Sequence, residues 1–351
     1  MSVFVILFLL LSIIYFGGSE KRRRVDCLLC FLLLWLVQAL RSTDVGHDIS
    51  NAYLPAFLSF DNVDLSLLFK DTIGYSFEIG FQAYLKIVKL ITNNVNVFLA
   101  ISSFIILAPV AYNFYKYSRK PELSFIIFAS VILYHFSFSG LRQAIAVSLC
   151  FMTYSFIIKR RLLPFLLFVI LAFYFHKSAL VFLPAYFLYG LKFDVKSFII
   201  VAIALVIVFM YVGPIAEFFR DIIFGDTAYY GYMDDQVASF GLTILYVLMA
   251  VFLFVFSDKK DVSHSFLCWM SVMVLVFQPL ALISQVADRV GYYYLIFFSL
   301  SIPNVISQSP TLSKGTKSLI SPIIIVLMIA FFFYCNAGGY LEVIPYKFFW
   351  Q

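Results

Sequence analysis

The chain has 351 residues, of which 63% are hydrophobic and 13% are charged, and its mean hydropathy is +0.97. Soluble domains carry about 25% charged residues, so this composition excludes a water-soluble globule, and it also excludes a disordered chain. The five cysteines are odd in number and lie in or beside apolar runs, so they predict no disulfide framework. The composition therefore predicts an all-α integral membrane protein.

Twelve apolar segments have the character of membrane-spanning helices, which need about 20 mostly apolar residues, or somewhat fewer when flanking residues snorkel. Several are short, and the stretch 162–191 is almost continuous. The whole chain, 1–351, is expected to form one transmembrane domain. The predicted spans are 2–17, 26–40, 95–115, 122–138, 142–158, 162–175, 177–191, 198–213, 241–257, 264–283, 289–307 and 318–335.

The Lys and Arg residues divide unequally between the two sides that these spans define. The first apolar segment has no positive residue before it and is followed by the basic run 21–24, so we expect no cleavable signal and an outer N-terminus. Strict alternation then places sixteen of the 25 Lys and Arg residues in cytoplasmic loops, as the positive-inside rule requires. The C-terminus is also extracytoplasmic, and the formal charge of +6 reflects topology and predicts no nucleic-acid partner.

Three extracytoplasmic segments are expected: a first large loop at 41–94, a second at 213–240 and a C-terminal tail at 336–351. Long loops in compact proteins are usually functional or disordered, and the aromatic content of these favours packing. In the first loop, apolar side chains recur at helical spacing from Phe77 to Ile91, which predicts a helix lying in the membrane interface. The polar face of that helix is predicted to carry Glu78, Gln82, Lys86 and Lys89.

The motif F-S-F-S-G-L-R-Q-A-I-A, at 136–146, places Arg142 and Gln143 at an outer turn between two predicted spans. Gly140 permits a tight turn, and the following helix directs its N-terminal N–H groups to the same place. A guanidinium beside exposed N–H groups suits an anion, above all a phosphate. The alternative is an interfacial arginine that snorkels to lipid phosphates.

The segment R-S-T-D-V-G-H-D-I-S-N-A-Y, at 41–53, gathers Arg41, Asp44, His47 and Asp48 where the second span leaves the membrane. A carboxylate or a neutral imidazole at such a place can deprotonate a hydroxyl nucleophile. Asp48 can instead cap a short helix, and the helix dipole alone can account for Glu78 at the start of the interfacial helix.

Two further polar residues lie at outer span ends. His176, in F-H-K-S-A-L, falls at a hinge between two spans, where a histidine is either functional or a structural hydrogen-bonding group. Arg289 follows Asp288 at the start of another span. Adjacent residues on a helix do not face each other, so Arg289 can point toward an anion, with snorkelling as the alternative.

Several nucleotide and metal motifs are absent from the sequence, namely G-x-x-x-x-G-K-[ST], G-x-G-x-x-G, H-E-x-x-H and D-x-D. We therefore expect neither a cofactor nor a metal. An enzyme that handles a diphosphate here would stabilise the developing negative charge with arginines.

Taken in order, these pieces resemble the EpsG-like, Wzy-type polysaccharide polymerase family. Each piece is short, and it is their combination over most of the chain that carries the resemblance. The resembling pieces lie at 40–53, 78–81, 136–148, 176–180 and 344–348.

The resemblance implies a GT-C-like fold and a glycosyltransferase on the outer face of the bacterial inner membrane. Such enzymes join oligosaccharide repeat units carried on undecaprenyl diphosphate into O-antigen, capsule or exopolysaccharide by inversion at the anomeric carbon. Carried onto this chain, Arg142 binds the diphosphate, and His176, Glu78 or Asp48 orients or deprotonates the acceptor hydroxyl. The expected partners are the lipid bilayer, a chain-length regulator and a flippase. Further substrate-binding residues are then Arg41, Gln143, Arg289, Asp44 and Tyr53.

Two alternatives stay open from the sequence alone. A transporter or flippase of lipid-linked oligosaccharide also suits twelve spans, but it predicts charges near mid-membrane and detectable repeats. An O-antigen ligase is an alternative within the enzyme class.

Overall fold

The computed structural model describes residues 2–60, 77–211, 240–278, 289–337, 339 and 341–351. Within these ranges the chain is all-helical, apart from one isolated antiparallel bridge between Arg41 and Phe348. The predicted second outer loop, 213–240, falls outside the described residues except for its last residue. The part of the first outer loop at 61–76 falls outside them as well.

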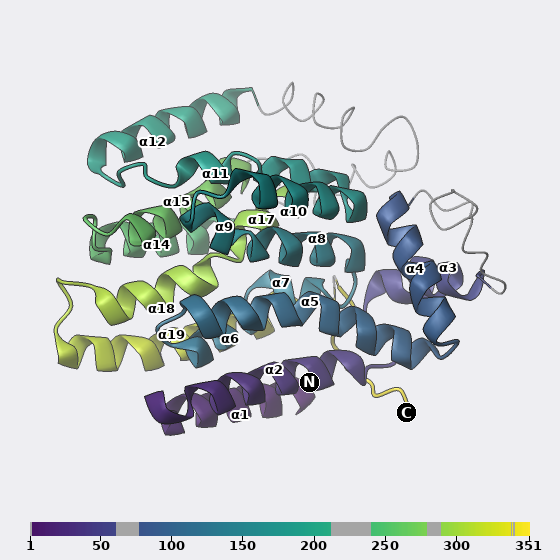
Figure 1. Cartoon of the computed structure of the whole chain (residues 1–351). Helices are drawn as coiled ribbons and strands as arrows, with labels where there is room; N and C mark the ends of the chain where they lie inside the picture. The colour runs from purple at the N-terminus through teal and green to yellow at the C-terminus, as the bar shows by residue number, and fades with distance from the viewer. Residues whose placement is uncertain (1, 61–76, 212–239, 279–288, 338, 340) are drawn as a thin grey trace.

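Apolar helices lying side by side form the body of the molecule (Figure 1). Each of the twelve predicted spans contains helical residues. The helices of the first half are α1 (Ser2–Gly17), η1 (Glu20–Arg22), α2 (Arg23–Ala39), η2 (Ile49–Tyr53), α3 (Leu54–Leu58), α4 (Ile79–Ile91), α5 (Val95–Tyr117), α6 (Pro121–Ser130), α7 (Ile132–Phe136), α8 (Leu141–Met152) and α9 (Tyr154–Ile158). Those of the second half are α10 (Leu162–Phe175), η4 (Lys177–Phe182), α11 (Ala185–Leu188), α12 (Val195–Met210), α14 (Phe240–Phe256), α15 (Val262–Phe277), η7 (Arg289–Gly291), α17 (Tyr292–Leu295), α18 (Phe298–Gln308) and α19 (Lys314–Asn336).

Four predicted spans are divided into more than one helical segment: 142–158 into α8 and α9, 289–307 into η7, α17 and α18, and the two described next. The segment 122–138 is interrupted at Val131, whose backbone is extended between α6 and α7. The segment 177–191 consists of η4 and the short α11, and Pro184 stands at the junction, where its missing N–H ends the helical hydrogen bonding. In the described part of the chain, four helices are long and apolar enough to cross a membrane: 95–117, 141–158, 289–308 and 314–336. The total of twelve spans therefore stays a prediction.

Burial separates a protein-facing core from helices with a large apolar exposed surface. Every residue of α6 is buried, and 94% of the apolar window in 289–308 is buried. By contrast, α12 exposes Ile203 by 55% and Met210 by 71%, and α1 exposes Ile6 and Leu9 by more than half. Apolar exposure of this extent over long helices matches the hydrocarbon interior of a bilayer.

The helix α4 lies where the interfacial helix was predicted, but part of its predicted polar face is buried. Gln82 and Lys86 are 1% and 2% exposed, whereas Ile91 is 69% exposed. Gln82 donates a hydrogen bond to the Phe77 carbonyl at 2.8 Å, and the Lys86 ammonium lies 5.4 Å from the centroid of the Phe60 ring. Phe81 and Leu85 on the predicted apolar face are also fully buried, so both predicted faces of α4 contact protein, and the polar side chains have partners there.

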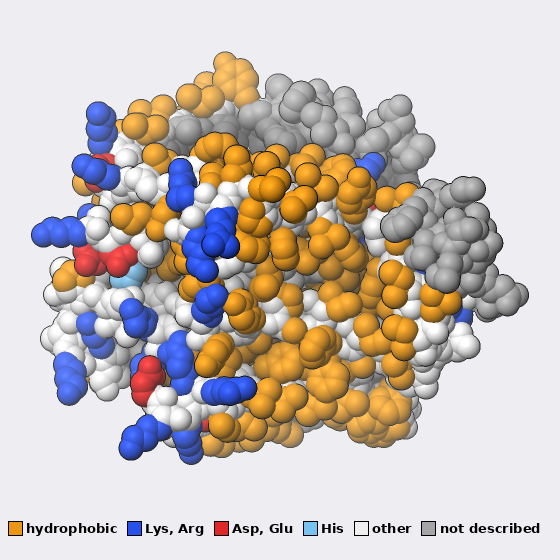
Figure 2. Space-filling model, viewed as in Figure 1, with side chains coloured by type: hydrophobic (Ala, Val, Ile, Leu, Met, Phe, Trp, Pro, Cys, Tyr) orange, Lys and Arg blue, Asp and Glu red, His pale blue; other side chains and the backbone are white. Residues whose placement is uncertain are grey.

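The two ends of the helical body differ in charge. Figure 2 shows Lys and Arg side chains gathered at one end of the visible face, with hydrophobic side chains across its middle. Hydrogen bonds and a ring contact join the basic loops at that end, so these loops share one side of the molecule. The joining contacts are Arg23 to the Tyr115 carbonyl, Asn304 to the Tyr117 carbonyl, His264 to Gln308, Arg160 to the Tyr186 carbonyl, and the Tyr189 ring to the Phe266 ring. At the opposite end lie α3, α4 and the C-terminus (Figure 1).

Cysteine labelling tests whether the two ends face opposite sides of the membrane. His47 and Lys260 are exposed and lie at opposite ends, while four of the five native cysteines are buried. The positive-inside rule predicts that a membrane-impermeant maleimide labels His47→Cys in intact cells and labels Lys260→Cys only after the membrane is disrupted. Labelling of both positions in intact cells would contradict this topology.

Candidate functional site

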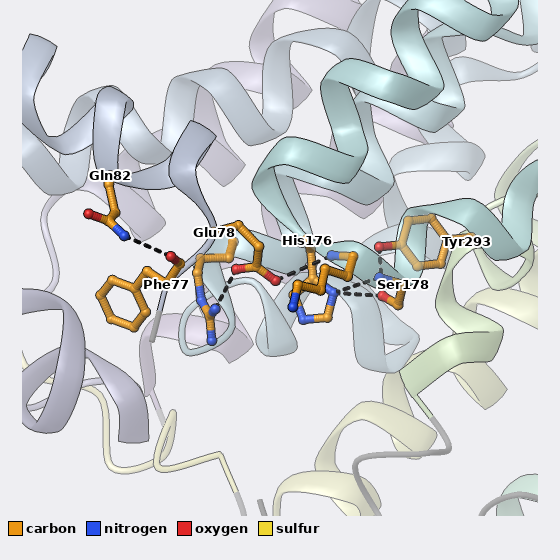
Figure 3. Close-up of polar contacts among 8 residues, drawn as sticks. Phe77, Glu78, Gln82, His176, Ser178 and Tyr293 are labelled. Atoms are coloured by element: carbon orange, nitrogen blue, oxygen red, sulfur yellow. Dashed lines mark hydrogen bonds and ion pairs between the residues drawn. The ribbon is translucent and has the colours of Figure 1, made fainter. Parts of the chain in front are cut away.

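An ion pair between Arg142 and Glu78 joins helices that are far apart in the sequence. Arg142 Nη1 lies 2.5 Å from Glu78 Oε2, and each side chain is 12% exposed. The other carboxylate oxygen of Glu78 accepts a hydrogen bond from the backbone N–H of Lys177 at 3.2 Å. Glu78 therefore ties the first turn of α8 to the hinge between α10 and η4, as Figure 3 shows.

A tight turn places Arg142 at the N-terminus of α8. The Gly140 N–H donates to the Phe136 carbonyl at 2.9 Å, and a Cβ at Gly140 would lie 2.2 Å from the Phe136 ring. Only glycine allows this approach, so α8 begins at once after the turn. No side chain in the described part of the chain caps this N-terminus, so its backbone N–H groups are directed toward the region of Arg142.

Aromatic rings pack against the Arg142 side of the ion pair. The Arg142 guanidinium lies 4.6 Å from the centroid of the Phe77 ring. Tyr53, which the sequence suggested as a substrate-binding residue, is 3% exposed and packs its ring against Phe77 and Phe81. Tyr53 therefore contributes to the packing that supports Arg142.

The environment of Glu78 holds its carboxyl group in the ionised form. Burial by itself raises the pKa of Glu78, but Arg142, His176 and the N–H of Lys177 more than offset it, and the pKa lies below its ordinary value. A carboxylate with a lowered pKa that already pairs with a guanidinium is a weak proton acceptor. The geometry thus favours Glu78 as the group that orients Arg142.

His176 lies beside this pair and is neutral at pH 7. Burial lowers the pKa of His176 to about 4; Glu78 opposes the effect, and the cations of Arg142, Arg289 and Lys177 add to it. The Nδ1 atom of His176 lies 2.6 Å from Ser178 Oγ. A neutral imidazole is therefore surrounded by three cations, which is a suitable environment for an anionic ligand.

Gln143 and Arg289 join the same cluster, but not in the way that the sequence suggested. Gln143 is 5% exposed and donates from Nε2 to the Arg289 carbonyl at 2.8 Å. The Arg289 guanidinium lies 5.2 Å from the centroid of the Phe136 ring, on the turn that precedes Arg142. Gln143 thus positions Arg289. The sequence had instead suggested that Gln143 binds an anion directly.

Arg41 and Asp44 do not contact this cluster in the structure. Arg41 is fully buried and donates to the carbonyls of Gln38 at 2.6 Å and Phe138 at 3.3 Å. Its guanidinium also lies 4.9 Å from the centroid of the Phe138 ring. Asp44 is exposed and lies 3.9 Å from Lys347 Nζ in the tail. In this structure Arg41 stabilises the turn that carries Arg142.

Asp48 lies beside the same turn and is half-buried. Its backbone N–H donates to Ser139 Oγ at 3.1 Å, and its side chain makes no capping bond to η2. Gly46 has a φ of 104°, and a Cβ there would lie 2.2 Å from the Phe138 carbonyl oxygen. The close approach at Gly46 fixes the backbone of residues 46–48 against Phe138 and Ser139, and the helix-capping alternative for Asp48 is wrong.

Three residues in or beside the cluster had not been proposed as site residues from the sequence. Phe77 supports Arg142, and Ser178 joins His176 to Tyr293 through a hydroxyl contact of 2.9 Å. The H-x-S spacing at 176–178 is a signal that points to Ser178. Tyr293 belongs to a run of three tyrosines in a buried span, and nothing local marks it as different from its neighbours.

Removal of the Glu78 charge tests the ion pair. Removing one partner of a buried pair costs about 3–5 kcal/mol, and because both side chains are slightly exposed we expect the lower end for Glu78→Gln at pH 7. The pKa of Glu78 is lowered, so the stabilisation is present above its ordinary value and is lost as pH falls through the lowered value. Thermal unfolding in detergent as a function of pH measures it. The exposed Asp44→Asn is the matched control, and an equal melting temperature for wild type and Glu78→Gln at pH 7 would disprove the pair.

The comparisons with known proteins agree with this architecture. The EpsG family model matches residues 24–348, which is nearly the whole chain and includes every residue of the cluster. No curated protein and no solved structure matches the chain significantly. The matched range, together with the apolar helices, leads to one conclusion: the chain belongs to the EpsG family, whose members are membrane proteins associated with polysaccharide biosynthesis.

Proposed function

We propose that the chain is an inverting glycosyltransferase that polymerises oligosaccharide repeat units carried on undecaprenyl diphosphate, at the outer face of the bacterial inner membrane. The observation that carries the proposal is the cluster of Arg142, Glu78 and His176, with Arg289 close by. Membership of the EpsG family supports the chemistry. The grouping of the basic loops at the opposite end supports an outward orientation of the cluster.

In the proposed reaction, a hydroxyl oxygen of the acceptor glycan attacks the anomeric carbon of the donor. The new C–O bond forms as the bond from that carbon to the diphosphate breaks, and the electron pair leaves on the phosphate oxygen. Arg142 and Arg289 stabilise the negative charge that develops there, and Glu78 holds Arg142 in place. The proton of the attacking hydroxyl passes to a carboxylate of the protein.

We propose Asp48 as that proton acceptor. Glu78 is already occupied by Arg142 and the Lys177 N–H, and its pKa is lowered, so it is the weaker candidate. Asp48 is half-buried, makes no helix-capping bond, and is held beside the Arg142 turn through Ser139. A carboxylate in this position can accept a proton without losing an ion pair.

Substitution of Arg142 tests the polymerase assignment. Loss of the guanidinium removes charge from the leaving diphosphate, so Arg142→Ala should abolish long glycans, and Arg142→Lys should retain a small fraction because it keeps the charge without the fork geometry. The measurement is the glycan ladder in cells with equal protein levels. Arg160→Ala is the matched control, since Arg160, like Arg142, lies over an aromatic ring, that of Tyr186, but belongs to the basic end.

Two outcomes would redirect the assignment. A full ladder with Arg142→Ala would remove polymerisation by this site. Loss of single-unit glycan export, with polymer length unchanged, would favour a flippase, and loss of glycan only from lipid A would favour a ligase. The proposed chain-length regulator and flippase partners would then be tested separately by co-purification.

The choice of proton acceptor is tested by Asp48→Asn and Glu78→Gln. If Asp48 takes the proton, Asp48→Asn should reduce the rate of polymerisation by about 100-fold or more. Glu78→Gln should act mainly through the position of Arg142 and lose stability as well as rate. Rates measured on purified protein with lipid-linked donor and acceptor decide between them. Near-normal activity of Asp48→Asn would contradict the assignment.

A further inference from the structure

His176 is the end of a buried chain of hydroxyl groups. The hydroxyl of Tyr293 lies 2.9 Å from Ser178 Oγ, and Ser178 Oγ lies 2.6 Å from His176 Nδ1 (Figure 3). The backbone N–H of Ser178 also donates to Nδ1, at 3.4 Å. Tyr293 is 0% and Ser178 is 2% exposed, so water does not replace these bonds.

The direction of donation along this chain follows from the groups that compose it. A backbone N–H can only donate, so its contact requires a lone pair on Nδ1. The Ser178 hydroxyl then donates to Nδ1, and the Tyr293 hydroxyl donates to Ser178 Oγ. In the reverse direction the Tyr293 proton would need another acceptor, and the described residues provide none. The hydroxyl chain therefore favours a neutral imidazole whose proton is on Nε2.

We propose that Ser178 and Tyr293 are positioning residues that fix His176 as a neutral hydrogen-bond donor, with Nε2–H directed to a phosphate oxygen of the lipid-linked substrate. This inference rests on the proposed function for the identity of the acceptor oxygen. It goes beyond that function because it gives His176 a donor role and removes it from the candidates for general base. A ring nitrogen that already carries a proton cannot take one from the acceptor hydroxyl.

The surroundings of His176 suit a donor to an anion. Within the described part of the chain, Nε2 makes no hydrogen bond to the protein. The charged and titratable groups that face the ring come from five different segments, and three of them are cations. They are Glu78 before α4, Arg142 on α8, Lys177 on η4, Arg289 on η7 and Tyr293 on α17.

Replacement of His176 by an amide separates a donor from a base. The side-chain NH₂ of Gln can stand where Nε2–H stands, but an amide cannot accept the proton as a base. We expect His176→Gln to keep polymerisation within about tenfold of wild type, and His176→Ala to lose about 100-fold or more. Equal inactivity of the two variants, with normal protein levels, would overturn the donor role.

The tautomer of His176 can be measured without an activity assay. Its measurement therefore tests the proposed protonation of His176 independently of the proposed function. The chain has four histidines, so nitrogen NMR of ¹⁵N-histidine-labelled protein in lipid can assign His176 by comparison with His176→Gln. We expect the neutral form protonated on Nε2 throughout the pH range above about 4. A ring protonated on Nδ1 would overturn the proposal even if the chain is a polymerase.

Hydroxyl deletions test the two positioning residues. Ser178→Ala removes a donor that stabilises the neutral ring, so the NMR titration of His176 should move to higher pH and the rate should fall about tenfold. Tyr293→Phe should cause a smaller change in the same direction. Tyr294→Phe is the matched control, because the Tyr294 hydroxyl donates to the Val181 carbonyl and does not reach His176. Unchanged tautomer and titration in Ser178→Ala would disprove the role of this residue.

Discussion

The ion pair between Arg142 and Glu78 is the constraint on which the rest of the site depends. A guanidinium at the edge of an apolar bundle is costly unless a carboxylate and aromatic faces compensate it. Here Glu78 supplies the carboxylate at 2.5 Å and Phe77 supplies the ring. Because the same carboxylate accepts the N–H of Lys177, the pair also fixes the hinge on which His176 lies.

Several segments that seem unrelated in sequence stabilise this pair. Gly140 allows the turn before α8, and Arg41 and Gly46 pack residues 40–48 against Phe138 in the same turn. The tail pairs with that segment through the bridge between Arg41 and Phe348. The buried guanidinium of Arg41, which donates to backbone carbonyls, thus supports the turn that carries Arg142. The side chain of Arg142 is itself 12% exposed. These different roles explain why two arginines at the same end of the molecule have different surroundings.

The sequence predicted the helical class and the turn before Arg142 well, because long apolar runs and the G-L-R-Q motif are local signals. The positions of Arg142, Glu78 and His176 could each be proposed, but their contact could not, since it depends on how α4, α8 and the α10–η4 hinge pack. The burial of the polar side chains of α4 shows the same limit. Periodicity predicts an apolar and a polar face, but Gln82 and Lys86 are buried together with the apolar face because other segments provide partners for them.

The role of each site residue was harder to predict than its position in the chain. Arg41 and Arg142 have the same chemistry in sequence, and only burial distinguishes the structural cation from the candidate ligand-binding one. Tyr293 could not be told from Tyr294 without the contact to Ser178. Such assignments depend on individual hydrogen bonds at the ends of helices, which sequence patterns of 3.6-residue period do not encode.

The most direct test is diphosphate binding by the purified protein, with farnesyl diphosphate as a short probe and farnesol as the control for the lipid tail. We expect wild type and Arg160→Ala to bind farnesyl diphosphate equally and more tightly than farnesol, and we expect Arg142→Ala to bind farnesyl diphosphate at least about tenfold more weakly. Equal affinity of wild type and Arg142→Ala for farnesyl diphosphate would contradict the central claim.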